Sequence, residues 1–139
     1  MKRVTTAIVF ILIAIALCLT GYAVSLNKLN SINQTLGKAA YVSKIEDKEG
    51  TIDAAKEVED EWSKSSVILF TLLIHTDMDE IDAKINMLSF FAQKENFEEF
   101  EKICNESIVI SNHLIDSQKA SFENIFWLKL SLKVFMFKF

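Results

Sequence analysis

The chain has 139 residues, half of them hydrophobic, with three glycines and no proline. This length fits one small domain, and the lack of proline indicates long helices joined by short connections. All 19 acidic residues lie between positions 46 and 123 with only seven lysines among them, a net charge of −12 that would repel nucleic-acid phosphates.

The first predicted element is a membrane anchor over residues 1–26. Residues 4–26 carry no charge and follow Lys2 and Arg3. As a helix they would be about 34 Å long, enough to cross a hydrocarbon core of about 30 Å. We therefore expect a single-pass protein of the cell membrane. Because basic residues stay on the cytoplasmic side, its N-terminus would be cytoplasmic and its bulk extracytoplasmic.

A cleaved signal peptide is the alternative for this segment. Gly21-Tyr22-Ala23 places small residues around a larger one, which is acceptable for cleavage. The mature chain would then begin at Val24 and be secreted. The length of the apolar run, and the helical pattern that continues beyond it, favour the anchor.

Residues 27–126 are predicted to form an acidic helical domain. Apolar residues three and four apart continue the anchor helix as far as Leu36 or beyond. The same spacing predicts helices over about 51–74, over Met78 to Ala92, and from Phe97 onward. The predicted fold is therefore all-α: a transmembrane helix followed by a small antiparallel bundle of about four helices, arranged as two helical hairpins.

Three local features accompany these helices. The segments 46–50 (EDKEG, a predicted turn that ends in KEG) and 94–96 (KEN) are predicted to separate the helices of each hairpin. Residues 67–74 (VILFTLLI) are apolar almost all round and are expected to be the most buried part of the domain. The run 57–61 (EVEDE) is expected to be a solvated face.

The stretch 75–82 (HTDMDEID) combines a histidine with four acids. Asp77 and Glu80 have the spacing of a capping box, which predicts that they begin the third helix. His75 would then close the second helix, where a cation near the last carbonyls is favourable.

A divalent-metal site is the alternative for this stretch, with candidate ligands His75, Asp79 and Asp82, or Asp77 and Asp79, approached by His113 on the fourth helix. An EF-hand is excluded because a loop that starts at Asp77 would lack the glycine required at position six and the glutamate required at position twelve. A zinc site would need more nitrogen or sulfur ligands.

Patterns typical of catalysis are absent from the sequence. It has no nucleophile elbow, no glycine-rich phosphate loop and no paired-cysteine metal spacing. Cys18 lies in the apolar run, and Cys104 is expected to be a small core residue. We expect no enzyme activity and no cofactor.

The final segment, 127–139, is a basic-aromatic tail with three lysines. It is too short to span a membrane as a helix. Contact with the lipid interface is the favoured interpretation, with Trp127 and the phenylalanines buried. The alternation from Leu128 to Val134 leaves a β-strand as the alternative.

The order of these features resembles a known family. It comprises a basic start, one span, an acidic helix with Trp62, LLIH followed by Asp79-Glu80-Ile81, and SFENIF at 121–126. This order is similar to the uncharacterised bacterial membrane family catalogued as domain of unknown function 4363. The resemblance covers about residues 1–126 and stops before the tail. It implies a small single-span protein and no assigned reaction.

Together these features predict a non-enzymatic helical module on the outer side of the bacterial cytoplasmic membrane. Its expected partners are the lipid bilayer and another membrane or extracytoplasmic protein, with no nucleic acid. The alternative is a metal-dependent sensor or enzyme that uses the His75, Asp79 and Asp82 cluster.

Overall fold

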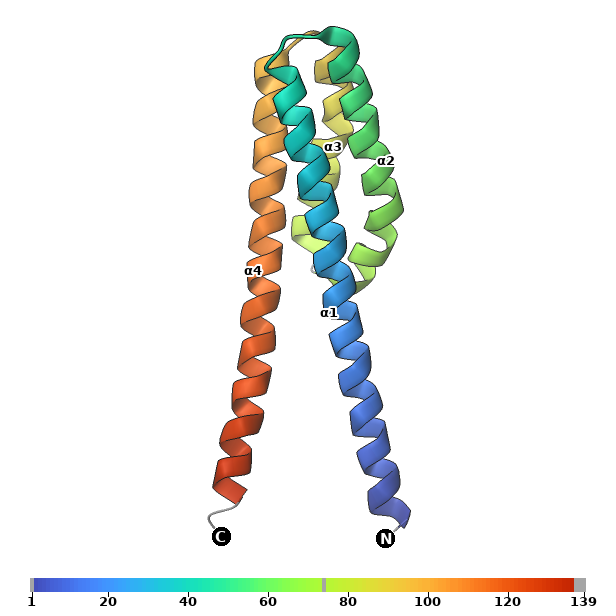
Figure 1. Cartoon of the computed structure of the whole chain (residues 1–139), viewed down its shortest axis with the longest axis vertical. Coiled ribbons are helices and arrows are strands. Elements are labelled where there is room, and N and C mark those ends of the chain that lie inside the picture. The colour runs from blue at the N-terminus through green and yellow to red at the C-terminus, as the bar shows by residue number, and fades with distance from the viewer. Residues whose placement is uncertain (1, 74, 137–139) are drawn as a thin grey trace.

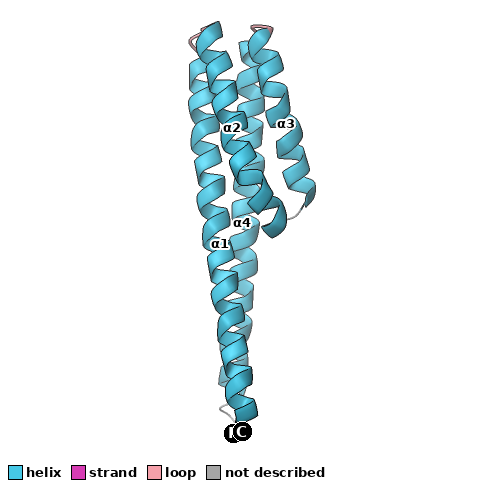
Figure 2. Ribbon diagram, turned by 90° about the vertical axis from the view of Figure 1, so that its right-hand side faces the viewer, coloured by secondary structure: helices cyan, strands magenta, loops and turns pink. Residues whose placement is uncertain are grey.

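The structure, a computed structural model, describes residues 2–73 and 75–136, with side chains described for 4–73 and 75–121. It consists of four helices: α1 (Lys2–Ser43), α2 (Lys48–Leu72), α3 (His75–Gln93) and α4 (Phe97–Met136), with no strand among the described residues. The start of α1 and the end of α4 project from the same end of the bundle (Figures 1 and 2). The predicted all-α fold with a long apolar N-terminal helix is confirmed.

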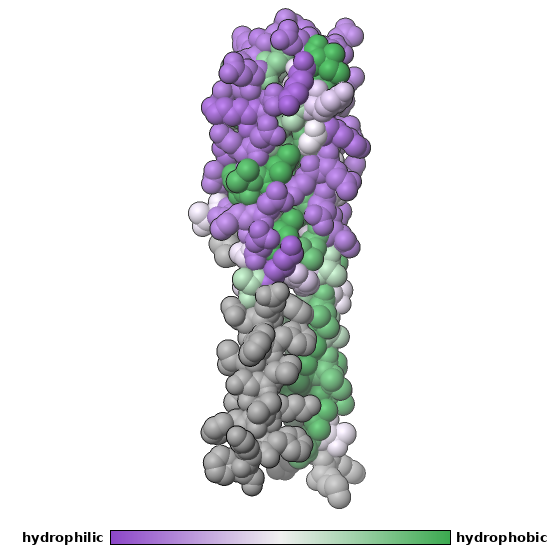
Figure 3. Space-filling model, turned by 60° about the vertical axis from the view of Figure 1, so that its left-hand side comes forward, coloured by the Kyte–Doolittle hydropathy of each residue, from purple (hydrophilic) through white to green (hydrophobic). Residues whose placement is uncertain are grey.

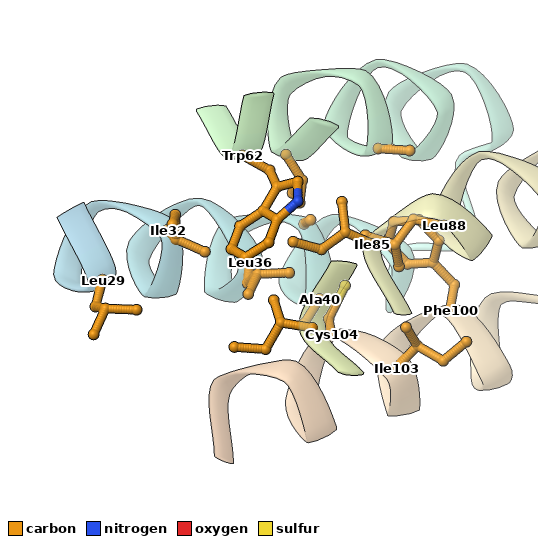
Figure 4. Close-up of a cluster of buried hydrophobic side chains, with 14 of the residues drawn as sticks. Leu29, Ile32, Leu36, Ala40, Trp62, Ile85, Leu88, Phe100, Ile103 and Cys104 are labelled. Atoms are coloured by element: carbon orange, nitrogen blue, oxygen red, sulfur yellow. The ribbon is translucent and has the colours of Figure 1, made fainter. Parts of the chain in front are cut away.

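The bundle is a ring of antiparallel neighbours. α1 packs against α2 and α4, and α3 packs against the same two helices from the opposite side. Each helix buries the face on which its apolar residues recur every three or four positions. Figure 4 shows these side chains meeting from all four helices, including Leu29, Ile32, Leu36, Ala40, Trp62, Ile85, Leu88, Phe100, Ile103 and Cys104.

The two hairpin turns share one backbone device. Glu46 in the first turn and Glu95 in the second adopt left-handed conformations, with φ of 57° and 56°. Such a residue ends a helix and lets the chain reverse. Lys48 joins the turns, with Nζ 2.6 Å from Oε1 of Glu95. The first turn falls at 44–47 and overlaps the start of the predicted turn at 46–50, whose last three residues begin α2 instead.

The junction of α2 and α3 differs from the prediction. α2 ends at Leu72, and the extended Leu73 donates its N–H to the carbonyl oxygen of Leu69 at 2.8 Å. α3 begins at His75, so His75 opens this helix rather than closing the previous one. Asp77 lies inside the first turn and is not the N-cap, so the capping-box interpretation is wrong. Asp77 still meets the positive end of the helix dipole there.

The end of α2 is not the most buried part of the domain. Leu69 is fully buried, but Val67, Ile68 and Leu72 are 74, 42 and 44% exposed. The expectation of deep burial was wrong because α2 has protein neighbours, α1 and α3, on one side only. Its opposite side carries apolar residues that no other part of the described chain covers.

The tail continues α4. The backbone is helical to Met136, so a β-strand over Leu128 to Val134 is wrong. The side chains of the tail lie outside the described ones, and its contact with lipid stays a prediction. The proposed segment limits at 26 and 126 both fall inside unbroken helices.

Candidate functional site

The N-terminal half of α1 is the most apolar surface of the described chain. Within Val4–Ser43 lies a stretch that is long and apolar enough to cross a membrane, and none of it is buried by the part of the chain that the structure describes. Figure 3 shows these residues in green below a mostly polar bundle. A signal sequence would share this length and composition. The large exposed side chains here are Val4, Ile8, Val9, Phe10, Ile11, Leu12, Ile13, Leu17 and Leu19.

The same helix then becomes part of the core without a break. Ser25 is 1% exposed and Leu29 is fully buried. Ser25 donates its hydroxyl to the side-chain carbonyl of Gln118 on α4 at 2.7 Å, and this bond links the two long helices where the bundle begins. One continuous helix therefore supplies both the uncovered apolar segment and one wall of the bundle.

A mostly apolar cleft marks the base of the bundle. It lies where α1, the end of α2 and α4 meet, and has a volume of about 760 Å³. Leu72 of α2 lies over Gly21 of α1, with Cδ2 3.4 Å from the place a Cβ would take. The lining also includes Leu17, Leu114 and Gln118. The end of α2 therefore sits level with Gly21, well inside the uncharged part of α1.

The candidate metal ligands are not gathered at one point. The His75 ring stacks on Phe70, with centroids 6.0 Å apart. The Nδ1 atom of His113 lies 3.7 Å from Oδ2 of Asp77, so this histidine approaches a carboxylate in the first turn of α3. Among the described side chains, those of residues 4–73 and 75–121, no three of His, Cys, Asp or Glu are placed to share an ion.

Asp82 has a structural role that the sequence did not indicate. Its Oδ1 accepts the indole N–H of Trp62 at 2.6 Å, and its Oδ2 accepts from the amide of Asn86 at 3.1 Å. Both carboxylate oxygens are occupied, while Asp79 is exposed one turn earlier. The metal-binding alternative is therefore not favoured.

The acidic face of α2 also contributes contacts between helices. Glu61 accepts the hydroxyl of Ser31 on α1 at 2.7 Å. Glu59 accepts the hydroxyl of Ser89 on α3. The run 57–61 is thus only partly a solvated face. Sequence reasoning missed these pairs because each serine lies on a different helix, 30 positions away.

A charged groove between α3 and α4 is internally paired. Lys84 lies 2.6 Å from Glu106 and 3.8 Å from Glu80. The hydrogen bond from Lys84 and the positive charge of Lys84 hold the pKa of Glu106 below the ordinary value. Lys102 lies 2.9 Å from Glu99, whose hydrogen bond and charge raise the lysine pKa. The two lysines thus neutralise part of the negative charge of these glutamates on the surface.

Cys104 is a buried core residue, as predicted, and has no exposed surface. Burial, with a smaller contribution from the charge of Glu101, raises the pKa of its thiol to about 12. A thiol with such a pKa stays protonated near neutral pH and is a poor nucleophile.

The family model for Domain of unknown function (DUF4363) matches residues 23–125, about three-quarters of the chain. The chain belongs to this family. The DUF4363 region starts at Ala23, just before the first buried residue of α1, and ends in α4 before the tail. It therefore coincides with the bundle. No curated protein and no solved structure matches the chain.

Proposed function

We propose that this DUF4363 protein is a membrane-anchored, non-enzymatic module that binds another protein on the outer side of a bacterial cytoplasmic membrane. The observation that carries the proposal is the course of α1. Its apolar half is uncovered, and its second half, from Ser25 onward, forms a wall of the bundle without a break. A helix held in lipid would thus hold the bundle directly at the membrane surface.

The charges support this orientation. Lys2 and Arg3 precede the uncharged run, and Lys28 is the next charge along α1. The positive-inside rule then keeps the N-terminus in the cytoplasm. All the acids lie beyond position 45, in the part of the chain that follows the uncharged run.

The partner surface we propose lies on α3. Met87 and Phe90 are three positions apart on one face of the helix and are 46 and 57% exposed. The Phe90 ring packs edge-on against Phe91, with centroids 5.3 Å apart, which holds it in place. Lys94 Nζ lies 5.9 Å from the centroid of the Phe90 ring. Methionine and preorganised aromatics are enriched where proteins bind one another.

Site-specific photo-cross-linking tests this proposal. A benzophenone amino acid replaces Phe90 in the full chain, expressed at its native level in the host. We expect a discrete adduct larger than the 15.8 kDa chain, whose second component is identified by mass spectrometry. The matched control places the same group at the exposed Asp53 of α2. Uncross-linked monomer alone at both positions would refute the proposal.

A further inference from the structure

The outward face at the end of α2 consists of Val67, Ile68, Thr71 and Leu72, and is called here the α2 end face. Its three apolar members are 42 to 74% exposed. At 100° per residue, the four positions span a sector of about 140°, which runs from the side opposite Leu69 at Val67 and Thr71 to an edge at Leu72, where the face meets α1. The hydroxyl of Thr71 is bonded to the carbonyl oxygen of Val67 at 3.0 Å, so it adds little polarity. No charged residue occurs between Lys64 and His75.

The depth of this face is set by the contact between Leu72 and Gly21. That contact places the end of α2 level with Gly21. From Val4 to Gly21, α1 rises about 26 Å at 1.5 Å per residue. A bilayer hydrocarbon core is about 30 Å thick. An α1 that enters the core at Val4 therefore leaves it close to the level of the α2 end face.

We propose that the α2 end face inserts into the outer boundary between lipid headgroups and acyl chains, in the same bilayer that holds α1. The inference rests on the proposed membrane anchoring. The occupant is lipid because the face adjoins the uncovered apolar surface of α1 through the Leu72–Gly21 contact. Apolar side chains at this level leave water for acyl chains, which is favourable.

The charges around the face limit how deep it goes. Asp77 and Asp79 lie in the first turns of α3, only about 3 to 6 Å further along the bundle axis than His75. Carboxylates are expensive in hydrocarbon and stay in water or among headgroups. The insertion is therefore shallow, and the bundle rests on the membrane rather than standing away from it.

Lipid-borne quenching of a fluorescent label tests the proposal. Single labels are attached at Ile68→Cys, Met87→Cys and Leu12→Cys in the full chain carrying Cys18→Ser, reconstituted into phosphatidylcholine–phosphatidylglycerol nanodiscs. Met87 is the matched control, since it is 46% exposed against 42% for Ile68, but sits 12 residues beyond the start of α3. Leu12 reports on the anchor itself.

We expect doxyl-labelled lipid to quench the labels at positions 12 and 68 several-fold more than the label at 87, which aqueous iodide quenches instead. Iodide quenching at 68 equal to that at 87, with lipid quenching kept at 12, would overturn this inference and leave the anchor intact. A label at 68 that neither agent reaches would assign the face to protein and also overturn it. Loss of lipid quenching at 12 would overturn the anchoring and the inference together. Repeating the series with Val67→Cys guards against a perturbed fold.

Discussion

Trp62 on α2 donates its indole N–H to Asp82 on α3, with Nε1 2.6 Å from Oδ1. The indole is 4% exposed, and the bond lies between two neighbouring helices of the ring. Asp82, which the sequence had suggested as a candidate metal ligand, therefore links two helices. The pair joins the hairpin formed by α1 and α2 to the hairpin formed by α3 and α4.

Trp62→Phe should destabilise the bundle by about 2–4 kcal/mol. The substitution removes one donor to Asp82 and leaves a cavity in the core. The free energy of unfolding is measured by urea titration with circular dichroism, on the full chain in detergent micelles. Asp82→Asn keeps an acceptor for the indole and should cost less. Equal stability of Trp62→Phe and wild type would show that the bond contributes nothing.

Gly37→Ala should stabilise the protein by about 0.5–1 kcal/mol. Gly37 lies in the interior of α1, where glycine loses more conformational entropy on folding than alanine does. A Cβ there would meet no atom within 4 Å. Gly50→Ala is the contrast, since its Cβ would lie 2.5 Å from Oδ2 of Asp47, and we expect no gain. Thermal unfolding compares the two, and a higher Tm for Gly50→Ala would contradict the packing described.

Cys104 should resist thiol reagents in the folded protein. In a Cys18→Ser background at pH 8, we expect modification by an aromatic disulfide reagent only as fast as the bundle opens, and complete reaction in denaturant. Burial raises the thiol pKa to about 12, which removes the reactive thiolate. Rapid reaction of the native protein would show that the core at Cys104 is open.

The same raised pKa predicts a pH dependence of stability. Above about pH 8.5 the unfolded chain loses the thiol proton while the folded chain keeps it. The free energy of unfolding therefore falls as the pH rises from about 8.5 toward 12. Cys104→Ala lacks this contribution, so its stability should fall less between pH 8 and pH 10.5. If the free energy of unfolding fell equally with pH in the two proteins, the result would argue against a buried neutral thiol.

Zinc, manganese and calcium should leave the protein unchanged. Asp82 is occupied by Trp62 and Asn86, and His113 approaches Asp77. Calorimetric titration is expected to give no saturable heat, and the melting temperature should not shift. Saturable binding that disappears in His75→Ala would restore the metal site.

Helix positions were predictable because apolar spacing reports directly on which face is buried. Met78, Ile81, Ile85 and Leu88 all face the core, as their spacing indicated. The two hairpin turns were placed to within a few residues for the same reason. Periodicity identifies a face but not the number of neighbours that cover it.

That difference accounts for the errors near α2. The apolar end of α2 looked buried from its composition, yet α1 and α3 cover only one side of it. The start of α3 was misplaced because Asp77 and Glu80 satisfy a local capping pattern, while the chain reverses earlier, around Leu73. Pairs such as Ser31 with Glu61 depend on which helices become neighbours, and spacing along one helix carries no such information.

The central claim is that α1 crosses the membrane and holds the bundle outside the cell. The most direct measurement is labelling with a membrane-impermeant maleimide in intact cells, using Lys2→Cys and Lys56→Cys in a Cys18→Ser background. Cys104 is buried and serves as an internal control that reacts only on denaturation. We expect Lys56→Cys to react in intact cells and Lys2→Cys only after permeabilisation. Protection of Lys56→Cys until lysis, or a mature protein that has lost position 2, would contradict the account.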